Sequence, residues 1–357
     1  MSIKKPIRLI ELFAGYGSQA MALRNIGADF ERYRVVEFEN NVLNSYNAIH
    51  GTGFPAIDIR DMSGDDLGIT EKENFSYIMT YSFPCTDLSL SGKVAGMKKG
   101  SGTRSGLLWE VERLMKETEN LPDVLMMENV PQVASKRNIE DFNDWIRFLE
   151  SKGYTNYIKV LNAKDFGIPQ NRRRCFVVSV LDGNEYKFPS GIHLKRSAKE
   201  YLDNNADERF YIDTARLRGM GSIVQENQET VLIRQATKRG YIECDSGGIA
   251  DLSYPTSRTR RGRVTENGNI CPTIMTSNHE LCVVYSVDRV RRLTPDECGR
   301  LMGVTDGDIE KMHRINSDTQ MYKQYGNSIV VKCLEAVFRN LDIEGIKTWD
   351  EIMKEGG

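Results

Sequence analysis

The first half of the chain alternates two kinds of hydrophobic pattern, and this alternation restricts the fold more than any other feature of the sequence. Short runs rich in β-branched and aromatic residues are typical of strands, whereas apolar residues that recur every three or four positions are typical of helices. Seven runs are predicted to be strands: residues 8–15, 33–39, 55–61, 75–83, 123–130, 154–163 and 174–180. The intervening segments are predicted to be helices: residues 17–27, 40–51, 106–120 and 140–153. This pattern predicts an α/β fold with a parallel sheet covered by helices on both faces, and ligands at the carboxyl ends of its strands.

The texture of the sequence changes after Phe188 and Pro189. Residues 190–286 have weaker periodicity, many Gly, Ser, Thr and Asn residues, and a group of closely spaced basic residues. Helical patterning returns from residue 287 onward. We therefore expect a first domain over residues 1–189, an inserted domain over 190–286, and a return segment over 287–357 that completes the first domain.

Composition excludes several classes of protein. No apolar run approaches the ~20 residues of a membrane span, and the basic start of the chain lacks the cleavage site of a signal peptide. The seven cysteines form no C-x-x-C pair and the four histidines stand alone, so we expect no metal site and a cytosolic protein with free thiols. Because the formal net charge is −2, any surface for nucleic acid has to be local.

A glycine-rich turn, Phe13-Ala-Gly-Tyr-Gly17, follows the first predicted strand. Glycines let the backbone approach a ligand, and the start of the next helix attracts negative charge. The stretch also fits the G-x-G-x-x-A dinucleotide pattern, so plain turn chemistry, NAD and other adenosine cofactors all remain open. Glu37 and Phe38 end the second predicted strand, and Asp58 and Ile59 the third. Together they describe an adenosine pocket, with an acid for the ribose, a ring for stacking and a carboxylate for the adenine amino group.

Cys85 follows Pro84 at the end of the fourth predicted strand, and two interpretations compete. A lone cysteine is usually a small buried residue without chemical function. A proline that directs the chain and a polar, glycine-rich stretch at 86–105 instead suit a nucleophile beneath a closing loop. A free thiol is only a few per cent thiolate at neutral pH, so such a nucleophile needs a nearby cation or a substrate that takes up a proton.

Charged residues follow in the same half of the chain and beyond it. Glu128 ends the fifth predicted strand, where it would either face the crevice of Cys85 or cap the next helix. Arg172 and Arg174 alternate into the last predicted strand and would project from one face, as an exposed basic edge or as crevice residues that bind an anion. Arginines and lysines between residues 234 and 263 make a local cationic surface. Such runs are commonly just solvated, but among Ser, Thr, Asn and Gln they also suit phosphate contact.

The motifs occur in the order FAGYG, EF, DI, FPC, ENV, QNRRR, RRLTPDE and YGNS. In this set and order the sequence resembles the cytosine-C5 DNA methyltransferases, from about residue 8 to 340 apart from the variable segment between QNRRR and RRLTPDE. The resemblance implies a Rossmann-like large domain for S-adenosylmethionine, with an inserted smaller, irregular and β-rich target-recognition domain at 190–286. It also outweighs the NAD interpretation. The residues that it implies for the cofactor pocket are Phe13, Gly15, Gly17, Glu37, Phe38, Asp58, Ile59, Pro84, Leu107 (or Leu108 in its place), Asn327 and Ser328.

The resemblance implies catalysis by Cys85, Glu128, Arg172 and Arg174. The Cys85 thiolate would add to C6 of a cytosine rotated out of the duplex, while Glu128 engages N3 and the exocyclic amine. Arg174, supported by Arg172, would orient the base and the glutamate. C5 then takes the methyl group, and loss of the C5 proton, which we expect to go to water, releases Cys85. Residues 86–105 would form the loop that closes on DNA. The DNA contacts that we expect are Ser91, Lys93, Gln170, Arg258, Arg260, Arg261 and Arg263.

These features lead us to expect a monomeric, cytoplasmic DNA cytosine-C5 methyltransferase of bacterial or phage type. Its substrate would be double-stranded DNA in a specific sequence context, within a restriction–modification or host-protection system whose cognate endonuclease acts separately. Three alternatives remain: a variant that acts on tRNA, a nucleotide-dependent oxidoreductase that uses the glycine turn, and a non-catalytic DNA-binding relative.

Overall fold

The computed structural model describes residues 3–84, 88, 96–100, 102–183, 185–276 and 280–355. The chain forms two compact units. The first consists of Met1–Leu161, Arg173–Gly191 and Cys333–Gly357, and the second of Asn162–Arg172 and Ile192–Lys332. The chain thus enters the second unit for its long excursion close to the boundary expected after residue 189. Residues 287–332 belong to the second unit by contact, whereas their sequence pattern grouped them with the segment that follows.

A six-stranded sheet runs through the first unit in the order β2-β1-β3-β4-β6-β5. Its strands are β1 (Ile7–Leu12), β2 (Phe30–Val36), β3 (Ser76–Tyr81), β4 (Val124–Asn129), β5 (Tyr154–Asn162) and β6 (Arg173–Leu181). β1 pairs in parallel with β2 and β3, and β3 with β4, but β6 runs antiparallel to β4. The predicted α/β class is confirmed, whereas the prediction of a wholly parallel sheet is wrong. The ten residues 163–172 between β5 and β6 are fewer than a parallel crossover needs, so the chain reverses there.

Residues 55–61, which were predicted to be a strand, do not form one. Pro55 cannot donate to a strand ladder. The carboxylate of Asp58 accepts a hydrogen bond from the Arg60 amide at 3.0 Å, which begins a short 3-10 helix, η1, at Ile59–Asp61. The segment still lies beside the end of β2, because the amide of Ile57 donates to the carbonyl oxygen of Glu37 at 3.0 Å.

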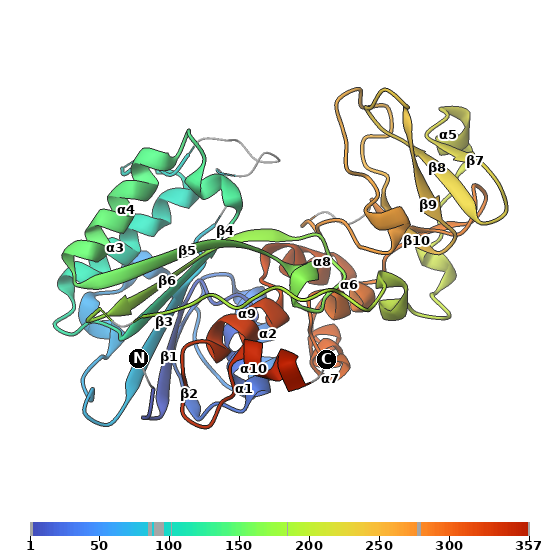
Figure 1. Ribbon diagram of the computed structural model, residues 1–357. Helices are drawn as coiled ribbons and strands as arrows, with labels where there is room; N and C mark the ends of the chain where they lie inside the picture. Colours follow the sequence, from blue (N-terminus) through green and yellow to red (C-terminus); the bar gives the residue numbers. More distant parts are fainter. Residues whose placement is uncertain are drawn as a thin grey trace. The chain divides into compact units, whose positions relative to one another are not determined.

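Helices cover both faces of this sheet, and each of the four predicted helices is present. The helices of this part of the chain are α1 (Ser18–Ile26), α2 (Asn40–His50), α3 (Leu108–Glu117), α4 (Ile139–Ser151), α9 (Val331–Arg339) and α10 (Trp349–Glu355). Figure 1 shows α3 and α4 on one face of the sheet and α1 and α2 on the other. The start of α3 is preceded by a 3-10 turn, η3 (Arg104–Leu107), so the regular helix begins later than its apolar pattern.

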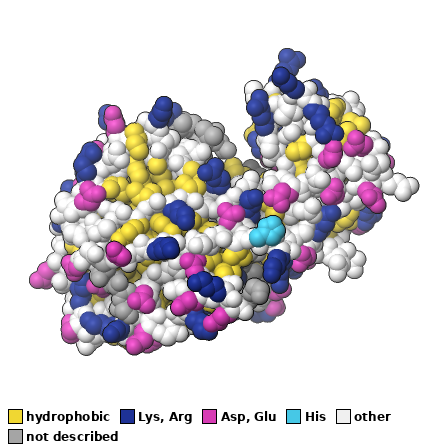
Figure 2. All heavy atoms as spheres, viewed as in Figure 1, with side chains coloured by type: hydrophobic (Ala, Val, Ile, Leu, Met, Phe, Trp, Pro, Cys, Tyr) yellow, Lys and Arg dark blue, Asp and Glu magenta, His cyan; other side chains and the backbone are white. Residues whose placement is uncertain are grey.

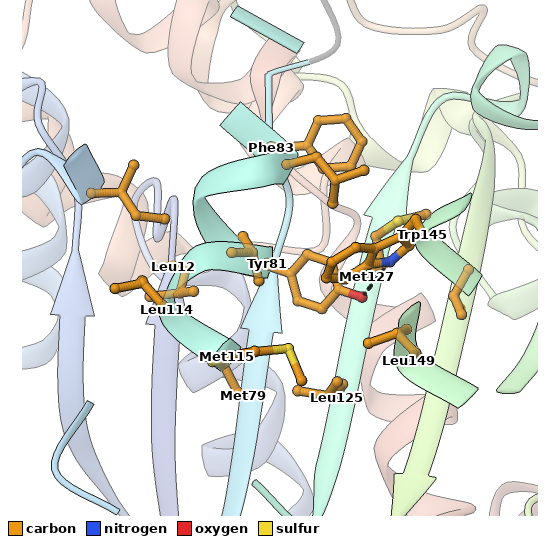
Figure 3. Packing of buried hydrophobic residues seen from close by; sticks show 14 of the residues in the cluster. Leu12, Met79, Tyr81, Phe83, Leu114, Met115, Leu125, Met127, Trp145 and Leu149 are labelled. Carbon is orange, nitrogen blue, oxygen red and sulfur yellow. Dashed lines mark hydrogen bonds between the residues drawn. The ribbon is translucent and has the colours of Figure 1, made fainter. Parts of the chain in front are cut away.

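The core under α3 and α4 packs large side chains against β3 and β4 (Figure 3). Trp145 of α4 stands edge-on to Tyr81 of β3, with ring centroids 5.5 Å apart, and its indole N–H donates to the Tyr81 hydroxyl at 3.1 Å. Met127 of β4 is fully buried in the same cluster. Such dense packing resists displacement of either strand. It therefore fixes β3, which precedes Cys85, relative to β4, which carries Glu128.

In its described residues, the second unit contains two small antiparallel sheets and four α-helices. One sheet contains β7 (Ile223–Gln225), β8 (Thr230–Arg234) and β9 (Tyr241–Asp245), and the other β10 (Gly248–Asp251), β11 (Leu281–Val284) and β12 (Val290–Arg292). Residues from both sheets share one apolar cluster. The helices are α5 (Ala215–Gly219), α6 (Pro295–Leu301), α7 (Asp306–His313) and α8 (Asp318–Asn327). The irregular, β-rich character expected for residues 190–286 is confirmed.

A buried ion pair ties β12 to α6 in this unit. The guanidinium of Arg291 donates to both carboxylate oxygens of Glu297, at 2.8 and 2.7 Å, and neither side chain is exposed. The same carboxylate accepts from the amide of Thr294, whose hydroxyl in turn caps the start of α6. In the described residues, no helix has the length and apolar character needed to cross a membrane.

Candidate active site

The turn after β1 places three residues in the left-handed region of backbone conformation: Phe13 (φ 59°), Gly15 (φ 60°) and Gly17 (φ 84°). Gly17 caps the start of α1. A methyl group on Gly17 would lie 2.3 Å from His50 Nε2 and 2.6 Å from a ring carbon of Tyr46. The equivalent position on Gly15 has no atom within 4 Å. Packing therefore requires glycine at position 17, whereas Gly15 leaves space beside the backbone for a ligand.

Glu37 follows β2 and is tied to the glycine turn. Its carboxylate accepts hydrogen bonds from the backbone amides of Gly15 at 3.1 Å and Glu39 at 2.9 Å. Burial raises the pKa of Glu37, and these two hydrogen bonds oppose that shift. The neighbouring Phe38 side chain is 51% exposed. This arrangement suits a ligand whose hydroxyl groups donate to Glu37 and whose flat ring stacks on Phe38.

The segment beside the end of β2 offers a second carboxylate. Asp58 forms an ion pair with Arg60, whose hydrogen bond lowers the pKa of Asp58, and 24% of the Asp58 side chain stays exposed. The next residue, Ile59, is almost fully buried. Of the two leucines considered for the cofactor pocket, Leu108 is fully buried and Leu107 is partly exposed. Leu107 is therefore the one that has surface to offer a ligand.

Two buried polar side chains hold the backbone that follows β3. The side-chain amide of Asn129 donates to the carbonyl oxygen of Phe83 at 3.0 Å. The hydroxyl of Ser105 donates to the carbonyl oxygen of Pro84 at 2.7 Å. The chain is thus anchored at two successive carbonyl groups immediately before Cys85.

Neither Asn129 nor Ser105 was among the residues that the sequence singled out. Asn129 follows Glu128 directly at the end of an apolar run. A polar residue at the end of a buried strand could have indicated a side chain that binds a neighbouring backbone segment. Ser105 lies between a glycine-rich stretch and a helix, a position in which serine is common as a cap, so nothing in the sequence marks it. Three residues that were predicted, Cys85, Ser91 and Lys93, lie outside the described residues.

Glu128 of β4 forms an ion pair with Arg174 of β6. Arg174 Nε lies 3.1 Å from Glu128 Oε1, and the two side chains are 15% and 8% exposed. Phe176 stands opposite Glu128 in the antiparallel pairing, so Arg174 occupies the diagonal position on the same face. The neighbouring Cys175 thiol is buried, and burial together with the charge of Glu128 raises its pKa to about 12. In a setting with so little solvent, the guanidinium fixes the position of the carboxylate.

Arg172 and Gln170 belong to the second unit and are buried there. The Arg172 guanidinium donates to the carbonyl oxygens of Ile274 at 2.7 Å, Gly326 at 2.8 Å and Ser328 at 2.5 Å. The side-chain amide of Gln170 donates to a backbone carbonyl of α6 at 2.7 Å, and its oxygen accepts from the amide of Ile274 at 3.1 Å. Both side chains therefore connect backbone segments that are distant in sequence.

Arg172 and Arg174 bind different groups, although strand alternation predicted a common face. β6 begins at Arg173, so Arg172 precedes the strand and the alternation does not reach it. The proposed support of Arg174 by Arg172 stays a prediction.

The YGNS motif forms the end of α8. Asn327 is the last residue of that helix and Ser328 caps it. A methyl group on Gly326 would lie 2.3 Å from the backbone nitrogen of Thr276, so only glycine permits this close approach of two backbone segments. Arg172 bridges the carbonyl groups on either side of Asn327, which fixes the backbone around the predicted cofactor residues.

The arginines of the expected DNA surface have different surroundings. Arg258 and Arg261 are exposed. Arg260 is partly exposed and forms an ion pair with Asp251. Arg263 is 2% exposed. The cluster in the sequence is therefore not a uniform basic surface.

Comparison with known proteins identifies the family. Residues 7–342 match the family model of the C-5 cytosine-specific DNA methylases. The chain is 34% identical to the type II methyltransferase M2.ScrFI of Lactococcus lactis subsp. cremoris, over 94% of this chain and 99% of that protein. It is 30% identical to the orphan methyltransferase M.SssI of Spiroplasma monobiae, over 93% of this chain and 96% of that protein.

Solved structures share the fold. The S. pombe Dnmt2 methyltransferase matches with a TM-score of 0.64 at 18% identity, over 95% of this chain and 98% of that chain. A putative DNA modification methyltransferase encoded within an E. coli prophage matches with a TM-score of 0.60 at 18% identity, over 94% and 98%. The resemblance carried by the ordered motifs is confirmed. The chain belongs to the family of C-5 cytosine-specific DNA methylases.

Proposed function

We propose that this chain rotates a cytosine out of duplex DNA and transfers a methyl group from S-adenosylmethionine to its C5 atom, in a specific sequence context. Membership of the family supports the class of reaction. For this chain, the observation that carries the proposal is the Glu128–Arg174 ion pair. It lies at the strand end whose next residue, Asn129, anchors the backbone before Cys85. A thiol, a carboxyl group and a guanidinium are the groups that addition to a cytosine ring requires.

The residues after β1 and β2 fit the adenosine part of S-adenosylmethionine. The open space at Gly15 would admit the ligand, Glu37 would accept from the ribose hydroxyls, and Phe38 would stack on the adenine. The exposed part of Asp58 would accept from the adenine amino group. S-adenosylmethionine supplies the methyl group as an electrophile on a positively charged sulfur. The other residues that we propose for cofactor binding are Phe13, Gly17, Ile59, Pro84, Leu107, Asn327 and Ser328.

Cys85 would start the reaction, because C5 of an intact cytosine ring is a weak nucleophile. Its thiolate forms a bond to C6, the ring loses its aromaticity, and the electron pair displaced from the C5–C6 double bond makes C5 nucleophilic. After C5 has taken the methyl group, the C5 proton leaves to solvent and the bond between Cys85 and C6 breaks. A base inside the duplex is out of reach for this attack, so the cytosine has to be rotated out first.

Glu128 and Arg174 would lower the cost of the addition. Glu128 would hold a proton at N3 and accept from the exocyclic amine, so that negative charge does not accumulate on the ring. Arg174 would keep the carboxyl group in the orientation that this contact needs, through the ion pair of 3.1 Å. Arg172 would act indirectly, by holding the backbone on both sides of Asn327.

Duplex DNA that contains 5-fluorocytosine tests this mechanism, because fluorine at C5 blocks the proton loss. In the presence of S-adenosylmethionine, the chain should form a covalent complex with DNA that survives denaturation, and Cys85→Ala should form none. Binding of S-adenosylmethionine and the melting temperature of Cys85→Ala, unchanged from the unmodified chain, would show that the variant is folded. An equally stable complex formed by Cys85→Ala would refute the role of Cys85. Methylation of tRNA but not of duplex DNA would refute the proposed substrate.

Bisulfite sequencing of DNA from cells that express the chain reports activity and sequence context in one experiment. We further propose that the methylation protects DNA against an endonuclease that recognises the same context. DNA from such cells should resist an endonuclease of that specificity, whereas DNA from cells that express Cys85→Ala should be cut.

A further inference from the structure

An aromatic ring stands on the surface of the second unit in an unusual backbone conformation. Tyr254, shortly after β10, is 69% exposed, more than any other large apolar side chain reported for the described residues. Its φ of 46° lies in the left-handed region, which bulky side chains rarely adopt, and the following Pro255 restricts it further. Such a conformation persists only when the surroundings enforce it. In the free protein, the exposed ring gains little from this position.

The buried guanidinium of Arg263 enforces the conformation of this loop. It donates to the carbonyl oxygens of Asp251 at 2.9 Å, Ser253 at 2.6 Å and Tyr254 at 2.8 Å. The Tyr254 carbonyl also accepts from the amide of Ser257 at 2.9 Å. A planar guanidinium cannot follow a moving loop without losing these hydrogen bonds. The three bonds from Arg263 therefore hold the Tyr254 backbone in one geometry.

A second arginine flanks the ring itself. Arg260 forms an ion pair with Asp251, and its guanidinium carbon lies 5.6 Å from the centroid of the Tyr254 ring. The Asp251 carboxylate also accepts from the amide of Ser253 at 2.9 Å. Two arginines therefore hold the exposed ring in place: Arg263 binds the backbone of the loop, and Arg260 lies beside the ring.

Cationic side chains lie around the exposed Tyr254 ring. Arg258 and Arg261 are exposed, and neither has a carboxylate partner within the part of the chain that the structure describes. The Arg261 Nε donates to the carbonyl oxygen of Ala236 at 2.8 Å, which brings the turn between β8 and β9, with its exposed Lys238, to the same place. Figure 2 shows basic side chains gathered over the upper part of this unit. Such a surface is complementary to the phosphates of nucleic acid.

We propose that Tyr254 contacts base edges in a groove of the duplex DNA substrate and contributes to the choice of sequence. Arg258 and Arg261 bind the flanking phosphates, while Arg263 and Arg260 position the ring. The assignment rests on the proposed function. Phosphate contacts orient a protein on DNA but carry no sequence information, whereas an aromatic ring fixed between them can discriminate base pairs. Arg263, whose donors are directed to backbone carbonyls, is thereby a positioning residue and not one of the DNA contacts that the sequence predicted.

The test uses the full chain and a duplex that carries the context found by bisulfite sequencing, with single-base variants of that duplex. Tyr254→Ala should lower kcat/KM on the correct duplex by about tenfold, as loss of one base contact does. It should also reduce the ratio of kcat/KM between the correct duplex and the single-base variants of that duplex. Arg258→Gln and Arg261→Gln should instead weaken binding to every duplex, and each should reduce the slope of log K against log salt by about 1. Ile315→Ala, which removes a side chain 48% exposed in the same unit, is the control for loss of exposed apolar surface.

The outcomes separate this inference from the proposed function. If the unmodified chain methylates duplex DNA and Tyr254→Ala discriminates among duplexes as well as Ile315→Ala does, the inference fails and the proposed function stands. If the unmodified chain methylates no duplex DNA, or only tRNA, both fail. Reduced discrimination by Tyr254→Ala with an unchanged salt slope supports the inference, because a general loss of folding would not leave the phosphate contacts intact.

Discussion

The side-chain amide of Asn129 donates to the carbonyl oxygen of Phe83 at 3.0 Å, so the end of β4 holds the backbone that follows β3. The side-chain oxygen (Oδ1) of Asn129 in turn accepts from the backbone amide of Val130 at 2.8 Å. One side chain therefore fixes both the turn after Glu128 and the approach to Cys85. Asn129 therefore links the strand end that carries Glu128 to the backbone two residues before Cys85.

Asn129→Ala should slow the covalent step more than it weakens cofactor binding. The change leaves two buried backbone groups without their partner, which costs about 1–3 kcal/mol of folding free energy. Urea unfolding measures that loss, and the rate of adduct formation with 5-fluorocytosine DNA measures the effect on Cys85. Ser105→Ala, which removes the donor to the Pro84 carbonyl, should show a smaller effect of the same kind. Adduct formation at the unmodified rate in Asn129→Ala would contradict the positioning role.

Glu128→Gln should abolish most methyl transfer while the protein stays folded. Glutamine has the same shape but cannot carry the proton to N3, and loss of such a contact costs about 100-fold or more in rate. Single-turnover methyl transfer gives the rate, and binding of S-adenosylmethionine should be unchanged. Glu335→Gln is the matched control, because Glu335 is also buried, at 4% exposure, and accepts from the side-chain amide of Asn25 at 2.8 Å. Equal losses in the two variants would show that the effect comes from burial rather than catalysis.

Gly17→Ala should destabilise the protein more than Gly27→Ala. Both glycines have left-handed backbone, with φ of 84° and 78°, so both variants incur about 1 kcal/mol of conformational strain. Only at Gly17 would the added methyl group also collide with His50 and Tyr46, whereas the position on Gly27 is open. Urea unfolding should therefore separate the two variants, and cofactor binding should fall in Gly17→Ala alone. Equal unfolding free energies would mean that the packing under the glycine turn is loose.

Glu11 should make the stability of the chain depend on pH. Its carboxyl group is fully buried on β1, and burial raises its pKa from 4.5 to about 7. Hydrogen bonds from the Tyr46 hydroxyl and the Ala20 amide, together with the charge of Arg32, act in the opposite direction and lower this pKa. Because the folded state retains a proton that the unfolded state has lost, this contribution is fully present below pH 4.5 and disappears as the pH rises through 7. The total change is about 3 kcal/mol at most.

The variant Glu11→Gln isolates this effect, because glutamine keeps an acceptor but does not titrate. Between pH 5 and pH 8, the unfolding free energy of the unmodified chain should fall relative to that of Glu11→Gln, because only the unmodified chain loses the contribution of Glu11. Guanidinium unfolding at several pH values measures it. A difference that does not change with pH would show that Glu11 has the same ionisation in the folded and unfolded states.

Much of the fold could be predicted, because most elements of the first unit follow from hydrophobic periodicity alone. The segment at 55–61 shows where periodicity fails: its apolar residues alternate as in a strand, but the Asp58 side chain captures the Arg60 amide and starts a turn. The reversal of β6 was missed for a different reason. Strand direction depends on the length and path of a connection, and the residues of β6 itself carry no sign of it.

The residues of the candidate site could be predicted where they belong to a recognisable motif. They could not be predicted where a side chain contributes only by binding the backbone of a distant segment. Glu128 and Arg174 pair as their positions suggested. Arg263, by contrast, looked like its neighbours in the sequence, and only its burial separates it from them. Ser105 and Asn129 act on carbonyl groups of distant residues, which no local pattern records.

The reversal of β6 makes its register along β4 decisive for the chemistry. A slip by one residue would turn Arg174 to the other face of the sheet and present the thiol of Cys175 to Glu128 instead. The connection at 163–172 sets that register, since it delivers the start of β6 to the edge where the other strands end. Insertion or deletion of a single residue in this connection should separate the Arg174 guanidinium from the Glu128 carboxylate, although neither residue is substituted. The length of the connection is therefore itself a determinant of activity.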